Sequence, residues 1–85
     1  SHREKKRYLL IKGKDVSKKA IEDVILEFIG VLGFAESSPQ IVKSGKGFVI
    51  LVINRGSLDK VRASFVMSKK DLQIVKVSGA VGKLK

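Results

Sequence analysis

Residues 46–55, KGFVILVINR, hold six consecutive apolar side chains between a glycine-rich turn and a polar Asn-Arg pair. The run is far shorter than the roughly 20 apolar residues that a membrane-spanning helix needs, and it is rich in β-branched types. A strand that is buried on both faces fits this pattern best. We therefore expect residues 46–55 to supply the central strand of a small sheet.

The first helix is expected to run from Ser17 to Leu32, because the period of the apolar residues changes there to three and four. Asp15 or Ser17 can cap its start, and Gly33 lies where a left-handed C-terminal cap is expected. One broad apolar stripe should face the core. Its members are Ala20, Ile21, Val24, Ile25, Phe28, Ile29 and Leu32.

The other elements are shorter. The pattern predicts strands at 8–11, 40–43 and 72–77, a hairpin turn at 44–46, and a second helix at 58–67. Ser57 is the expected N-cap of that helix, with Leu58, Val61, Phe65 and Val66 facing inward.

Right-handed crossovers applied to this order predict one α+β domain, a two-layer sandwich with the split βαβ (βαββαβ) arrangement that is called ferredoxin-like or RNA-recognition-motif-like. Its four-stranded antiparallel sheet should have the first and third strands in the middle, the fourth beside the first, and both helices on one face. We expect residues 1–85 to form this single domain, with a basic arm at 1–6 and a basic tail at 80–85.

Composition argues against catalysis by the protein itself. The chain has no cysteine, one histidine that lies in the arm, and eight scattered carboxylates, so no nucleophile, acid-base pair or metal-ligand set is indicated. The only apolar run after the basic N-terminus, at 8–11, is too short for the core of a signal peptide. A soluble, cytoplasmic protein is expected.

The net charge of +10 predicts a polyanionic partner. Residues 1–19 hold eight basic and two acidic side chains, residues 69–85 hold five and one, and residues 20–68 hold five of each. Because the first and fourth strands should be antiparallel neighbours, the basic arm and the basic tail are expected to meet at one end of the sheet. We predict that they merge there into one RNA-binding patch.

Lys46-Gly47-Phe48 also matches the first three positions of the RNA-recognition motif consensus. Further along the consensus, aliphatic residues stand at Ile50 and Ile53 where aromatic residues are expected. Only Tyr8 and Phe48 remain as candidates for base stacking, while Leu9, Ile11, Ile50 and Val52 would offer aliphatic carbon on the face opposite the helices. We expect a protein partner or the chain's own tail to cover that face.

The alternative is a stand-alone domain that binds single-stranded RNA by stacking on Tyr8 and Phe48. A ligand-binding regulatory domain of the same fold would leave the charge unexplained.

Several short motifs follow one another in a characteristic order. They are Arg7-Tyr8-Leu9 in the first strand, the glycine-rich hairpin, Arg55 after the central strand, Val61-Arg62-Ala63 in the second helix, and Val77-Ser78-Gly79 at the end of the last strand. In this order and spacing the chain resembles ribonuclease P protein component 2, a family found in archaeal and eukaryotic ribonuclease P. The resemblance covers nearly the whole chain. The connection before the last strand and the C-terminal tail are shorter than the family pattern.

The resemblance implies a non-catalytic subunit of ribonuclease P, an endoribonuclease whose catalytic centre is RNA and which removes the 5′ leader from precursor tRNA. The implied partners are ribonuclease P RNA, precursor tRNA and ribonuclease P protein component 3, with a homodimer within a heterotetramer as one arrangement and no membrane. Mg2+ would be required by the RNA, and the protein itself would bind no cofactor. Basic side chains would act by neutralising RNA phosphates. The expected RNA-binding residues are Arg3, Lys5, Lys6, Arg7, Lys69, Lys70, Lys76, Lys83 and Lys85, with Arg55 added by its place in the family motif.

Overall fold

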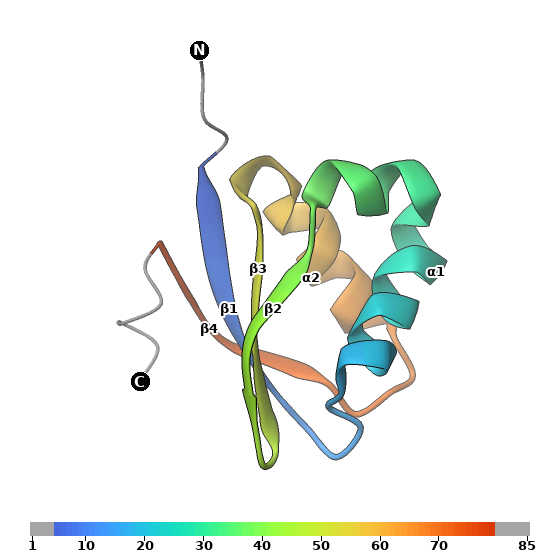
Figure 1. The fold of residues 1–85 in the computed structure, drawn as a ribbon. Coiled ribbons are helices and arrows are strands. Elements are labelled where there is room, and N and C mark those ends of the chain that lie inside the picture. The colour runs from blue at the N-terminus through green and yellow to red at the C-terminus, as the bar shows by residue number, and fades with distance from the viewer. Residues whose placement is uncertain (1–4, 80–85) are drawn as a thin grey trace.

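The fold is that of a computed structural model, which describes residues 5–79. Two helices and four strands follow one another, with one short 3-10 turn between them (Figure 1). In chain order they are β1 (Lys6–Lys12), α1 (Lys18–Ser37), β2 (Gln40–Gly45), β3 (Phe48–Asn54), η1 (Arg55–Ser57), α2 (Leu58–Met67) and β4 (Gln73–Ser78). The predicted α+β class is confirmed, and every predicted strand and helix is present.

The four strands form one antiparallel sheet in the order β2-β3-β1-β4. The two central strands are therefore β1 and β3, as expected, and β4 lies beside β1. Residues Val49 to Ile53 are all buried, which confirms that the longest strand-like run of the sequence lies in the middle of the sheet. Figure 1 shows both helices on the same side of this sheet.

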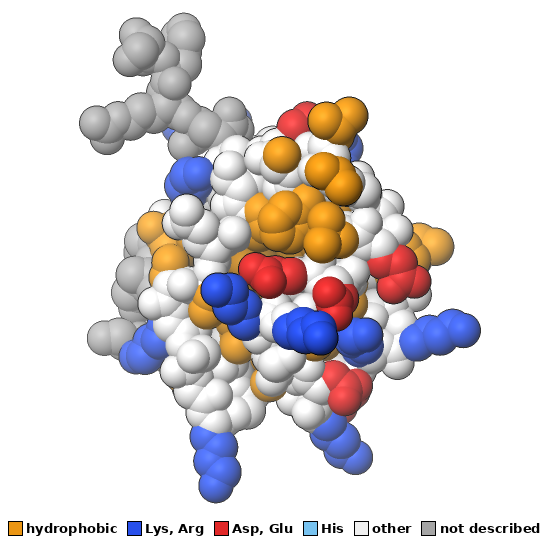
Figure 2. All heavy atoms as spheres, turned by 45° about the vertical axis from the view of Figure 1, so that its right-hand side comes forward, with side chains coloured by type: hydrophobic (Ala, Val, Ile, Leu, Met, Phe, Trp, Pro, Cys, Tyr) orange, Lys and Arg blue, Asp and Glu red, His pale blue; other side chains and the backbone are white. Residues whose placement is uncertain are grey.

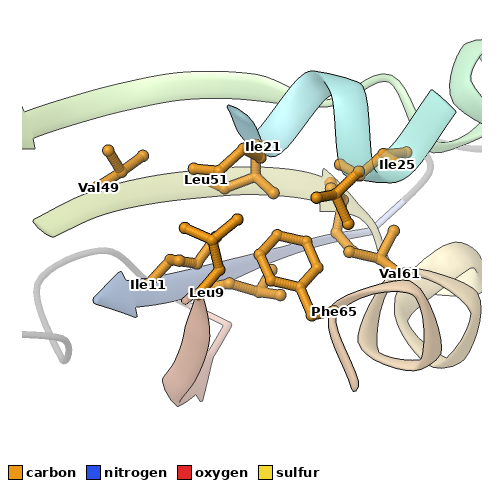
Figure 3. Close-up of a cluster of buried hydrophobic side chains, with 11 residues drawn as sticks. Leu9, Ile11, Ile21, Ile25, Val49, Leu51, Val61 and Phe65 are labelled. Carbon is orange, nitrogen blue, oxygen red and sulfur yellow. The ribbon is translucent and has the colours of Figure 1, made fainter. Parts of the chain in front are cut away.

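The core lies between the sheet and the two helices. Strand side chains alternate between the two faces, so only every second residue of each strand points toward the helices. On β1 these are Leu9 and Ile11, which are completely buried and pack with side chains of both helices (Figure 3). The remaining members of the cluster are Ile21, Val24, Ile25, Val49, Leu51, Ile53, Val61, Phe65 and Leu72. The other face of the sheet, which we call the open face, carries the alternate residues.

Helix α1 begins as predicted and ends later than predicted. The Ser17 hydroxyl accepts a hydrogen bond from the Ala20 amide at 3.1 Å, which confirms the N-cap. The prediction that Gly33 ends the helix is wrong, because helical structure continues to Ser37 and the left-handed residue is Ser38, with φ 46°. A break occurs instead at Gly30, whose φ of 74° and ψ of 179° are not helical.

The apolar residues of α1 that reach the core differ from the prediction on both sides of the break at Gly30. Phe28 and Leu32 were expected inside, yet 37% and 79% of their surfaces are exposed. After the break the helix no longer continues the stripe of its first half, and Phe34 packs against the core instead. The expected inward stripe therefore holds for Ala20, Ile21, Val24, Ile25 and Ile29, and it fails at Phe28 and Leu32.

Helix α2 has the bounds that the sequence predicts, but two of its details differ. Ser57 makes no capping hydrogen bond with its side chain, because it belongs to η1 and does not have the extended backbone of an N-cap. Val61 and Phe65 are buried as expected, whereas Val66 is 84% exposed and lies outside the core. Within residues 5–79, no helix is long and apolar enough to span a membrane.

Candidate nucleic-acid interface

The open face of the sheet consists of cross-strand rows that follow from the strand register. The middle row runs Lys43, Ile50, Leu10 and Lys76, from β2 across β3 and β1 to β4. Two aliphatic side chains thus lie at its centre and one lysine lies at each edge. With neighbouring strands about 4.8 Å apart, the Cα atoms of the two lysines are separated by about 14 Å.

The rows on either side each contribute one aromatic residue. Tyr8 lies opposite Val52 in one row, and Phe48 lies opposite Lys12 in the other. The Phe48 ring packs directly over Gly45, where any Cβ would collide with it. The absence of a side chain at Gly45 therefore leaves the space that this ring occupies. Tyr8 and Phe48 are both half-buried, so each ring keeps part of its surface accessible.

The prediction of a broad exposed aliphatic surface on the open face is wrong. Leu9 and Ile11, which were assigned to this face, point to the helices and have no exposed surface. Ile50 and Val52 do belong to the open face, yet they are only 4% and 7% exposed. The accessible part of the open face is therefore formed by polar groups, lysines, the two aromatic residues and the half-buried Leu10.

In residues 5–79 the carboxylates lie off the sheet, whereas basic residues lie both on the strands and on the helices. The four strands carry five basic residues, Lys6, Arg7, Lys12, Lys43 and Lys76. None of the carboxylate residues in the described range 5–79 lies on a strand. They lie in helices and loops, at Asp15, Glu22, Asp23, Glu27, Glu36, Asp59 and Asp71. The sheet therefore presents only cationic and neutral side chains, as a surface that binds a polyanion requires.

Four of the predicted RNA-binding residues meet at one end of the sheet. We call Lys5, Lys6, Arg7 and Arg55 the end cluster. The Arg55 amide donates to the Lys5 carbonyl at 2.7 Å, and Lys6 Nζ donates to Asn54 Oδ1 at 2.5 Å. Arg7 Nη1 donates to the Lys6 carbonyl at 2.9 Å. Backbone and side-chain contacts thus hold these four residues together.

The end of β4 lies at this end of the sheet too, as the sequence predicted. Tyr8 pairs with Ser78, and the position of a Cβ on Gly79 would be 3.3 Å from Arg7 Nη1. The antiparallel pairing of β1 and β4 is the cause, because it brings the start of one strand to the end of the other. Arg3, Lys83 and Lys85, and most of the predicted arm and tail, lie outside the described residues.

Lys69 and Lys70 do not join the end cluster, contrary to the predicted single patch. They lie in the loop before β4, and β4 begins at Gln73, which pairs with Lys12 at the far end of β1. Six residue steps along β1 correspond to about 20 Å. Asp71 anchors this loop, because its carboxylate accepts from the Lys14 amide at 3.0 Å and its own amide donates to Asp15 at 2.7 Å.

Three lysines lie on the open face, and the sequence prediction of RNA-binding residues named one of them. Lys76 was predicted and lies on the open face, whereas Lys12 and Lys43 were not singled out. The alternation of β1 could have identified Lys12, because it follows Tyr8 and Leu10 at intervals of two.

No protein-family model matches the chain, and a search of curated proteins finds no match. Function is therefore inferred from this geometry and from the motif resemblance.

Proposed function

We propose that this chain is a non-catalytic, RNA-binding protein subunit of ribonuclease P, of the component 2 kind, with a ferredoxin-like βαββαβ fold. The observation that carries the proposal is the composition of the sheet, whose strands hold only cationic and neutral side chains while all described carboxylates lie elsewhere. The motif resemblance is the reason for proposing ribonuclease P in particular. In this proposal the protein works in the cytoplasm on the RNA that removes the 5′ leader of precursor tRNA.

The lysines of the open face and the end cluster would act as point charges against RNA phosphates. Each phosphate that is neutralised releases condensed counterions, and this favours compact arrangements of a large polyanion. Such contacts position the RNA and carry no sequence information. The Mg2+ that the reaction needs belongs to the RNA in this proposal, and ribonuclease P protein component 3 is the protein partner. A homodimer within a heterotetramer is a further arrangement of the same subunits.

Reconstitution tests the proposal. Cleavage of precursor tRNA would be measured with ribonuclease P RNA and component 3, with and without this chain, over a range of Mg2+ concentrations. We expect the chain to lower the Mg2+ concentration at half-maximal cleavage, and we expect K12A/K43A/K76A to lose part of that effect. Equal cleavage at every Mg2+ concentration with and without the chain would remove the proposed role.

A second candidate function is a stand-alone domain that binds single-stranded RNA. It is favoured by one observation, which is that Tyr8 and Phe48 share the open face with both edge lysines of the middle row. Base stacking on such rings contributes about 1–3 kcal/mol per base. Tight binding of a short unstructured oligoribonucleotide, lost when both rings are removed, would favour this function over the first.

A further inference from the structure

The described chain exposes several large hydrophobic side chains, and half of them lie on one segment of α1. We call Leu26, Phe28, Val31 and Leu32 the α1 patch. Val31 and Leu32 are 76% and 79% exposed, which is unusual for adjacent aliphatic residues of a helix. Figure 2 shows hydrophobic side chains gathered on the upper part of this face of the molecule, with acidic side chains directly beneath them. Exposed hydrophobic side chains gathered in this way mark sites of protein contact.

Val31 and Leu32, which lie outside the core, directly follow the break at Gly30. Its φ of 74° and ψ of 179° belong to a region that glycine alone adopts without strain. Nothing lies within 4 Å of the position that a Cβ would take there, so the break is not enforced by a crowded neighbour. The chain therefore carries a glycine-dependent break that exposes two large aliphatic side chains, although the helix resumes directly after it.

The segment of sequence that holds the α1 patch is acidic, unlike the chain as a whole. Residues 20–42 hold four carboxylates and no lysine or arginine, within a chain of net charge +10. The four are Glu22, Asp23, Glu27 and Glu36. A surface with these groups repels RNA phosphates. The α1 patch and the proposed RNA-binding surface therefore lie on different sides of the domain.

We propose that the α1 patch is the docking surface for the protein partner of this subunit, a folded protein whose contact face is apolar and rimmed by lysine and arginine. Electrostatic complementarity identifies this occupant, because the four carboxylates favour a basic rim and disfavour an acidic one. A second copy of the chain does not fit. A symmetric dimer through this patch would bring the four carboxylates of each copy into one interface. The inference rests on the proposed function in one respect, which is that the partner used to test it is component 3.

The test measures binding of purified component 3 to the full chain by titration calorimetry and by mass in solution. V31S/L32S removes the most exposed aliphatic carbon of the patch. We expect it to bind component 3 roughly 100-fold more weakly, because burial of each aliphatic side chain contributes on the order of a tenfold effect. V66S/M67S is the matched control, since Val66 and Met67 are 84% and 66% exposed but lie on α2. The control should bind like the wild type.

A second variant tests the carboxylates that accompany the α1 patch. E27K/E36K reverses two exposed charges and should weaken binding while making it less sensitive to added salt, because attraction across the interface is lost. Thermal unfolding and RNA affinity of V31S/L32S should match the wild type, which excludes misfolding as the cause of any loss.

The outcomes separate the surface from the proposed function. Equal binding of component 3 by the wild type and V31S/L32S overturns the inference and leaves the pairing intact. A wild-type chain that does not bind component 3 overturns the pairing itself, and the inference with it. A dimer of the chain alone that V31S/L32S dissociates also overturns the inference, because the occupant is then a second copy.

Discussion

Replacing Lys12, Lys43 and Lys76 together with alanine should reduce the salt dependence of RNA binding. All three side chains are exposed and lie on the open face, where the strand register places them around Leu10, Ile50 and the Phe48 ring. The logarithm of the binding constant falls with the logarithm of salt concentration by about 0.7 to 0.9 for each neutralised phosphate. If each lysine neutralises one phosphate, the variant should lose about 2 to 3 units of slope.

The assay is filter binding of labelled ribonuclease P RNA to the wild type and the variant between about 50 and 400 mM salt, a range over which a slope change of this size is measurable. Lys18, Lys19 and Lys60 provide a charge-matched control, because they are exposed on the helices. K18A/K19A/K60A removes the same formal charge from the other side of the domain. We expect its slope to stay close to that of the wild type.

The comparison of the two triple variants tests whether RNA binds the open face or is attracted by net charge alone. Equal loss of slope in both would mean that net charge attracts RNA without a defined surface, and the assignment of the open face would be refuted. No loss in either would place the phosphate contacts elsewhere on the protein. The end cluster would then be the next surface to test, through variants of Lys5 and Arg55.

Three further predictions concern the aromatic rings, the break in α1 and the core. Replacing Tyr8 and Phe48 together with leucine should change the affinity for ribonuclease P RNA by less than about threefold, whereas a stacking surface would lose about 1–3 kcal/mol per base in the same filter-binding assay. Gly30→Ala should lower the free energy of unfolding in urea by about 1–3 kcal/mol, because φ 74° and ψ 179° strain any residue with a Cβ; an unchanged midpoint would contradict the break. Phe65→Ala should cost about 3–5 kcal/mol in the same measurement, since its ring is 5% exposed within the core, and a loss below about 1 kcal/mol would mean that the ring does not pack there.

The positions of the strands and helices could be predicted from the spacing of apolar residues. The run at residues 46–55 was correctly expected to be the central strand, and the bounds of α2 agree with the prediction. The end of α1 could not be predicted in this way. Gly30 and Gly33 are both glycines within an apolar helical pattern, and a periodic sequence does not say which one breaks the helix. The tertiary contacts of Phe34 with the core, which the sequence does not show, accompany the break at Gly30.

The candidate site is harder to predict from the sequence. The net charge of a sequence segment differs from the net charge of each face of the sheet, because one segment contributes residues to both faces. Residues 20–68 are neutral in sum, yet this sum hides the carboxylates of α1 on one side of the domain and Lys43 on the other. Lys43 is placed opposite Ile50 by an irregularity in β2 between Ile41 and Lys43, which has no signature in the sequence. The four apolar residues at 8–11 gave no sign of which two face the helices. A neutral segment can therefore contribute a lysine to the proposed RNA surface and carboxylates to the proposed protein surface, and the pairing of the strands places the two on different sides of the sheet.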